Sequence, residues 1–132
     1  MIKKLILIFT LVLLGMSFLT IKVNANIISV SFSPNTPGSQ TNQGDNTAGK
    51  NNTYWLVTIN FDNNSPTLQN GDLIIITFPT GFNFGGSTIG ITSNTIGATF
   101  GTITKSLNVI NIPVTGNQTS AGQIDIGITN AI

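Results

Sequence analysis

The stretch "NGDLIIITFPTGFNF", residues 70–84, decides the fold. From Leu73 to Phe78 only Thr77 is polar, and turn residues bound the run on both sides. Such a run is far too short to cross a bilayer, and its β-branched residues disfavour a helix. It predicts one buried β-strand, either central and covered on both faces or an edge covered by a partner. The inward side chains would be Ile74, Ile76 and Phe78, with Pro79 ending the strand.

Four further segments alternate apolar and polar residues, which is typical of strands with one buried face. They are NIISVSFS (26–33), YWLVTINF (54–61), NVINIPV (108–114) and QIDIGITN (123–130). Strands at a spacing of about ten residues, separated by Asn, Gly, Ser and Pro turns, predict an all-β antiparallel sandwich. The side chains expected to point inward are Ile28, Val30, Phe32, Trp55, Val57, Ile59, Phe61, Ile110, Ile112, Val114, Ile124, Ile126 and Ile128. Pro113 predicts an edge strand or a strand end, because proline lacks a backbone N–H.

Residues 1–25 have the anatomy of a secretory signal peptide, and we call them the leader. Two lysines precede an apolar core from Leu5 to Leu19, and Val23-Asn24-Ala25 forms a small-residue processing signal. Cleavage is expected before Asn26. The alternative is a retained membrane anchor, because the apolar core approaches spanning length. We therefore expect one mature domain, residues 26–132, that is secreted or held at the cell surface and has no membrane contact after cleavage.

Loss of the leader reverses the charge. The full chain carries a formal net charge of +1, but the mature domain would keep two lysines against four aspartates, a net charge of −2. This balance gives no support to a nucleic-acid site or to binding of an anionic membrane. The chain has no cysteine, so the fold must be held by its core without disulfides. Residues 26–132 include 16 Ile, 4 Val and 17 Thr, a β-branched content that again favours sheet.

Two regions do not fit a plain run of strands. Residues 33–53 contain no aliphatic side chain larger than alanine, which predicts a flexible surface loop or a tether that loosens the first strand. In residues 87–107 the pair Thr-Ile recurs at 88/89, 95/96 and 102/103. The recurrence predicts two short strands joined by glycine turns. The alternative is a short β-solenoid with ranked threonines, as an ice- or polymer-binding face requires.

The residue types exclude most catalytic chemistry. The chain contains no His, Cys, Glu or Arg, which removes catalytic triads, histidine bases, thiolates and zinc sites built from His or Cys. We therefore expect no catalytic residue, no cofactor site and no enzyme. Asp62 and Asp72 are expected to be turn residues beside Asn63 and Gly71. A calcium site is the alternative, with ligands from Asp45, Asp62, Asp72 or Asp125.

Three further motifs have both a structural and a functional interpretation. Tyr54 and Trp55 are expected to pack in a strand, although aromatic rings at such positions also stack on sugars. The glycines of GFNFGG, residues 81–86, do not open a helix, so a phosphate cradle is not expected. Asn-x-Ser/Thr triplets begin at Asn51, Asn63 and Asn117, and chance accounts for them in so Asn- and Thr-rich a chain.

A series of motifs runs along the predicted domain. Tyr54–Phe61 is followed by Gly71-Asp72 and by a strand that ends Phe78-Pro79-Thr80-Gly81-Phe82, and later by Ala121-Gly122 and Ile128-Thr129-Asn130. This series resembles the repeated Ig-like β-sandwich modules of secreted surface proteins of bacteria and archaea. The similarity covers about two thirds of the mature domain. It implies a structural or adhesive module and supplies no catalytic residue.

The chain departs from that pattern at two points. Residues 40–52 look like an insertion, and the modules usually continue past Ile-Thr-Asn with another Thr-rich strand. A sandwich without its last strand exposes unpaired backbone groups that can template another chain. We therefore expect protein–protein contacts through sheet edges. One hypothesis is a filament in which residues 26–32 fill the gap of a neighbouring copy. The predicted function is a secreted, non-enzymatic structural or adhesive module, and the alternative is a carbohydrate- or ice-binding module.

Overall fold

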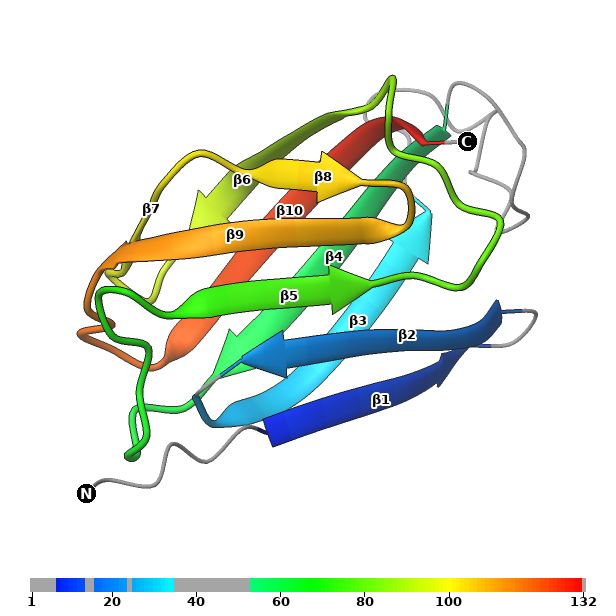
Figure 1. Ribbon diagram of the computed structural model, residues 1–132. Helices are drawn as coiled ribbons and strands as arrows, with labels where there is room; N and C mark the ends of the chain where they lie inside the picture. The colour runs from blue at the N-terminus through cyan, green and yellow to red at the C-terminus, as the bar shows by residue number, and fades with distance from the viewer. Residues whose placement is uncertain (1–6, 14–15, 24, 35–52, 132) are drawn as a thin grey trace.

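The computed structural model describes residues 7–13, 16–23, 25–34 and 53–131, with side-chain surroundings for Ile21, residues 25–31 and residues 55–129. Every regular element in these ranges is a β-strand, and the strands form two antiparallel sheets (Figure 1). The predicted all-β class is therefore confirmed. None of the described residues belongs to a helix with the length and apolar character of a membrane span.

The two sheets divide the strands as follows. One sheet has the order β1 (Leu7–Leu13), β2 (Met16–Val23), β5 (Leu73–Thr77), β9 (Val109–Gly116) and β7 (Thr99–Phe100), with β8 (Thr104–Ser106) also paired to β9. The other has the order β3 (Ile27–Pro34), β4 (Thr53–Phe61), β10 (Gly122–Ala131) and β6 (Thr88–Asn94). In Figure 1 the first sheet lies in front of the second, whose strands cross behind it at an angle. The layers are those of a sandwich.

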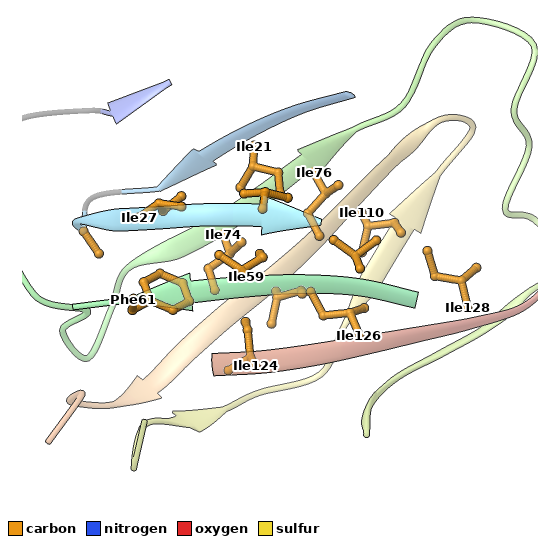
Figure 2. Close-up of a cluster of buried hydrophobic side chains, with 14 of the residues drawn as sticks. Ile21, Ile27, Ile59, Phe61, Ile74, Ile76, Ile110, Ile124, Ile126 and Ile128 are labelled. Atoms are coloured by element: carbon orange, nitrogen blue, oxygen red, sulfur yellow. The ribbon is translucent and has the colours of Figure 1, made fainter. Parts of the chain in front are cut away.

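The core lies between the sheets and is built mainly from isoleucine. Of the predicted inward side chains whose surroundings are described, all except Ile28 are buried. Within a sheet the inward residues face each other across strands: Ile74 lies opposite Ile112, and Ile124 lies opposite Ile59. Figure 2 shows these side chains gathered in the space between the layers. Alternation along the sequence thus places one apolar face of β4, β5, β9 and β10 in the core.

The β5 strand is covered on one face only, so the expectation of cover on both faces is wrong. Ile74 and Ile76 have no exposed surface, whereas the outward Leu73 is 43% exposed and Ile75 is half-buried. Nothing packs fully over the outer face because the sandwich has only two layers. In its own sheet β5 lies between β2 and β9.

The inward face of β3 differs from the prediction at its first residues. Ile28 is 60% exposed, and Ile27 is buried in its place. The cause is an irregularity in the pairing with β4 between Ile27 and Ser29, which changes the face to which the next side chain points. Val30, beyond this bulge, is buried as predicted. The side chain of Phe32 lies outside the described residues.

Pro113 marks neither an edge strand nor a strand end, which corrects a second prediction, because β9 continues to Gly116. The β9 strand is internal, with β5 on one side and β7 and β8 on the other. Pro113 lies where the second neighbour is interrupted, because β7 ends at Phe100 and β8 begins at Thr104. The missing N–H is therefore not needed there, and the Pro113 carbonyl accepts a hydrogen bond of 2.8 Å from Gly101 N.

Part of the leader forms strands in this structure. The β1 and β2 strands pair with each other, and Thr20, Ile21 and Lys22 of β2 pair with Thr77, Ile76 and Ile75 of β5. Ile21 is 1% exposed and belongs to the core cluster. Cleavage before Asn26 stays a prediction.

The two irregular regions have different outcomes. Of the predicted loop or tether, residues 35–52 lie outside the described residues. The Thr-Ile region forms three short strands, β6, β7 and β8, where two were expected. Its pairs do not stack in ranks, because 88/89 lies in β6, 95/96 follows β6, and 102/103 lies between β7 and β8 in the other sheet. A β-solenoid is therefore not the architecture of this region.

Neighbouring residues of β5 give a direct test of the layer arrangement. We expect Ile74→Ala to lower the free energy of unfolding by about 2–5 kcal/mol, because it removes a fully buried side chain and leaves a cavity. Leu73→Ala is the matched control on the outer face, and it should cost under about 1 kcal/mol. Urea unfolding of both variants measures the difference. Equal losses would show that the faces are assigned wrongly.

Candidate functional site

The three described aspartates are each held by the protein itself. Asp62 accepts hydrogen bonds from the backbone N and the side-chain amide of Asn64, at 3.0 and 3.1 Å. Asp72 accepts one from Gln69 N at 2.8 Å, which closes the turn before β5. Both therefore act as turn residues, as predicted. Asp125, within β10, accepts a bond of 2.6 Å from the Thr58 hydroxyl.

These carboxylates do not converge on a common point. The residues that the structure describes contain no group of three or more His, Cys, Asp or Glu side chains placed to hold a metal ion. Asp45, the fourth residue of the calcium hypothesis, lies outside them. The acid oxygens that calcium would need are engaged separately, in a turn at Asp62, a turn at Asp72 and a strand at Asp125.

Gln118 ties together the connections at one end of the sandwich. Its side chain is buried, its Oε1 accepts from Leu68 N at 3.2 Å, and its Nε2 donates to Asp62 O at 2.5 Å and to Ser120 O at 3.0 Å. The β4–β5 connection is thereby bonded to the β9–β10 connection. Sequence reasoning missed this residue, because a glutamine in a polar loop gives no sign that the fold will bury it.

The aromatic residues are core residues where their side chains are described. Trp55 is 2% exposed and packs edge-to-face on Phe82, with ring centroids 5.2 Å apart. Phe78 and Phe84 pack in the same cluster, with centroids 4.8 Å apart. The predicted strand packing of Trp55 is confirmed, and its buried ring offers no platform to a sugar. The side chain of Tyr54 lies outside the described residues.

The GFNFGG segment forms a turn instead of a ligand cradle. Its two phenylalanines are buried, Asn83 Oδ1 accepts from Gly85 N at 2.9 Å, and Ser87 N donates to the Phe84 carbonyl. Of the Asn-x-Ser/Thr triplets, Asn63 and Asn117 are exposed, while Asn51 lies outside the described residues.

Several threonine hydroxyls are engaged within the protein. Thr95 Oγ1 accepts from Gln123 N at 2.8 Å, and Thr99 and Thr115 bond to each other at 3.0 Å across β7 and β9. These bonds link neighbouring strands and connections. Hydroxyls engaged in this way are not free to form the regular array that an ice- or polymer-binding face requires.

Leu107 is the most exposed large apolar residue in the described chain, at 68%. It stands in the two-residue connection between β8 and β9, and its backbone has a positive φ of 47°. Its neighbour Asn108 donates from Nδ2 to the Phe78 carbonyl at 2.5 Å, and Phe84 N donates to the Leu107 carbonyl at 2.9 Å. These bonds hold the hairpin tip against the aromatic cluster. Leucine is not a usual residue at a positive φ, so Leu107-Asn108 does not match the Asn-Gly or Asp-Gly pattern that predicts a two-residue hairpin turn.

Comparison with known proteins adds no assignment: no family model, curated protein or solved structure matches the chain significantly.

The Gln118 contacts predict a measurable loss of stability. We expect Gln118→Ala to lower the free energy of unfolding by about 1–3 kcal/mol, because it leaves Leu68 N and the Asp62 carbonyl without their partner in a buried place. Gln69→Ala is the matched control. Gln69 is exposed and bonds only within its own turn, so its loss should cost under about 0.5 kcal/mol. Thermal or urea unfolding distinguishes the two, and a neutral Gln118→Ala would contradict the role given to this side chain.

Proposed function

We propose that the chain is a secreted, non-enzymatic structural or adhesive module of the Ig-like β-sandwich type, acting at a cell surface. The observation that carries the proposal is that the described apolar and acidic side chains have structural roles. Apolar residues of both sheets fill the core, and the three described aspartates are bonded in turns and between strands. The absence of His, Cys, Glu and Arg from the whole sequence supports the same conclusion.

The motifs shared with Ig-like surface modules fall at structural positions that suit that class. Tyr54–Phe61 lies within β4, Gly71-Asp72 forms the turn that enters β5, and Phe78-Pro79 follows the end of β5. Ala121-Gly122 stands at the start of β10. The Gly-Asp, Phe-Pro and Ala-Gly motifs thus lie where strands begin or end, while Tyr54–Phe61 and Ile128-Thr129-Asn130 lie within β4 and β10. This agreement supports the Ig-like type.

The strand order suits a module that transmits force. The β3 and β10 strands both pair antiparallel with β4, so they run parallel to each other with β4 between them. The start of β3 pairs with Phe61 at one end of β4, and the last residue of β10 pairs with Thr53 at the other end. A pull on those two points acts along the strands. Because ladder hydrogen bonds lie perpendicular to antiparallel strands, such a pull loads many of them at once.

Asn26 fixes the start of β3 to the connection after β4. Its backbone N donates to the Pro66 carbonyl at 2.9 Å, and its side-chain amide donates to the carbonyls of Asn64 and Ser65 at 3.2 and 3.3 Å. Asp62 N in turn donates to the Asn26 carbonyl. The expected N-terminal residue of the mature domain is therefore anchored to the fold at the point where force would enter.

The mechanical function predicts that resistance depends on the direction of pulling. We expect a higher unfolding force when handles are attached at Ile28→Cys and Asn130→Cys than at Ile28→Cys and Asn63→Cys. The first pair shears the β3–β4–β10 ladder, whereas the second opens β3 from β4 one bond at a time. Single-molecule force spectroscopy measures both, and the absence of native cysteine keeps the attachment specific. Equal forces would contradict a mechanical role for this sheet.

The location of the protein in its host tests whether it is a cell-surface module. Antibody raised against the protein should label intact cells of the native host, and protease added outside those cells should remove the label. A cytoplasmic marker protein provides the control for cell integrity. Labelling that appears only after lysis would refute a cell-surface module.

The alternative of a carbohydrate- or ice-binding module has less support. Trp55 is buried, and the Thr-Ile pairs occupy strands and connections of different sheets. The filament hypothesis requires β3 to be donated to a neighbouring copy. In the structure β3 pairs with β4 of its own chain. A donated β3 would have to leave that place.

A further inference from the structure

The β5 edge accepts an extra strand in the structure. In β2, Thr20, Ile21 and Lys22 pair antiparallel with Thr77, Ile76 and Ile75, without a break in register. Ile21 enters the core cluster that also contains Ile27 of β3 and Ile76 of β5 (Figure 2). The pairing strand comes from the predicted leader. Cleavage before Asn26 would therefore leave the β5 backbone unpaired on that side and would uncover core side chains of β3 and β5.

The other edges of the two described sheets carry features that discourage pairing. The β7 strand has two residues, β8 contains Lys105, β3 has its irregularity at Ile27–Ser29, and β6 contains Gly90 and a shift of register between Ile91 and Ser93. Short length, lysine and bulges are the usual protections of an edge strand. The β5 strand, LIIIT, has no charge, proline, glycine or bulge. Such a strand is a template for another strand once it is uncovered.

We propose that the β5 edge of the mature domain is an interaction surface for a second copy of this chain. The two copies pair through β5 itself, antiparallel about a two-fold axis. This inference rests on the proposed function in one respect, since it needs export and removal of the leader. In the precursor, β2 covers the edge, so pairing begins only after processing.

The second copy is the occupant that the structure favours, for two reasons. The same cleavage frees the same edge in both copies, and neither has to unfold any strand. Donation of β3 would instead break its pairing with β4 and the anchorage of Asn26.

The register follows from the length of the strand. With the axis at Ile75, all five residues of β5 pair, Ile74 lies opposite Ile76 of the second copy, and the two Ile75 side chains face each other on the outer face. Any shift by one residue would place inward side chains opposite outward ones, so the alternation protects this register. The inward isoleucines of the second copy then extend the core where Ile21 lies in the precursor. Isologous contacts of this kind are the commonest in homodimers.

The experiment uses the product that cells secrete from the full-length gene. Mass spectrometry establishes its N-terminus, and sedimentation or light scattering establishes its mass in solution. We expect a chain that begins at Asn26 and forms a dimer. A secreted product that keeps residues 7–23, or a processed product that stays monomeric at high concentration, would overturn the inference.

Charge substitutions at Ile75 locate the contact. Ile75→Lys and Ile75→Glu each place like charges opposite one another, so each should weaken the dimer at least about tenfold. Mixing the two variants places opposite charges together and should restore a dimer, which shows that both are still folded. Thr104→Lys on β8, an exposed position at the far edge of the same sheet, is the control and should leave the dimer unchanged.

The outcomes separate this inference from the proposed function. Two results together would overturn β5 pairing in favour of β3 donation. The protein would form open-ended polymers that persist in the Ile75→Lys variant, and these polymers would be lost when residues 26–33 are deleted. A monomer on the cell surface would also overturn it, but would leave a structural surface module standing. A chain found only inside cells would refute the surface module and would leave β5 covered by β2.

Discussion

The fold depends on the burial of isoleucine between two sheets. Nine isoleucines of the described chain have no exposed surface, and they come from strands of both layers and from the turn after β6. Burial of each such side chain is worth about 1.5–3 kcal/mol relative to exposure. No disulfide assists them, because the chain contains no cysteine. The remaining features of the molecule, its turns, its anchors and its edges, are arranged around this layer.

The same constraint explains why the polar residues are structural. A two-layer sandwich brings many connections to its two ends, and each connection has backbone groups that need partners. Gln118, Asp72 and Asn26 supply those partners at one end of the sandwich. The parallel β3 and β10 on either side of β4 are the feature on which the proposed mechanical role rests.

Much of the fold could be predicted because alternation reports burial directly. The inward sets of β4, β9 and β10 follow from a period of two and nothing else. Ile28 could not be predicted, since a bulge depends on how β3 meets β4 and leaves no trace in the local pattern. The prediction of an edge or a strand end at Pro113 failed for a similar reason. The interruption between β7 and β8 that accommodates this proline comes from another part of the chain.

Some residues of the candidate sites could be predicted from the sequence and others could not. The turn roles of Asp62 and Asp72 followed from their neighbours Asn63 and Gly71. Gln118 was missed because its burial arises only when two distant connections meet. An open sheet edge was expected from the lack of a strand after Ile-Thr-Asn, whereas the edge proposed above lies beside β5, where β2 pairs in the structure. That position depends on strand order, which no short stretch of sequence encodes.

Native-state hydrogen exchange of the secreted protein tests the central claim most directly, namely that one isoleucine layer shared by both sheets holds the molecule together. We expect the slowest backbone amides to lie in β4, β9 and β10 and to exchange at one common rate, that of global unfolding. Protection confined to one sheet, with the other exchanging as fast as the connections, would contradict it.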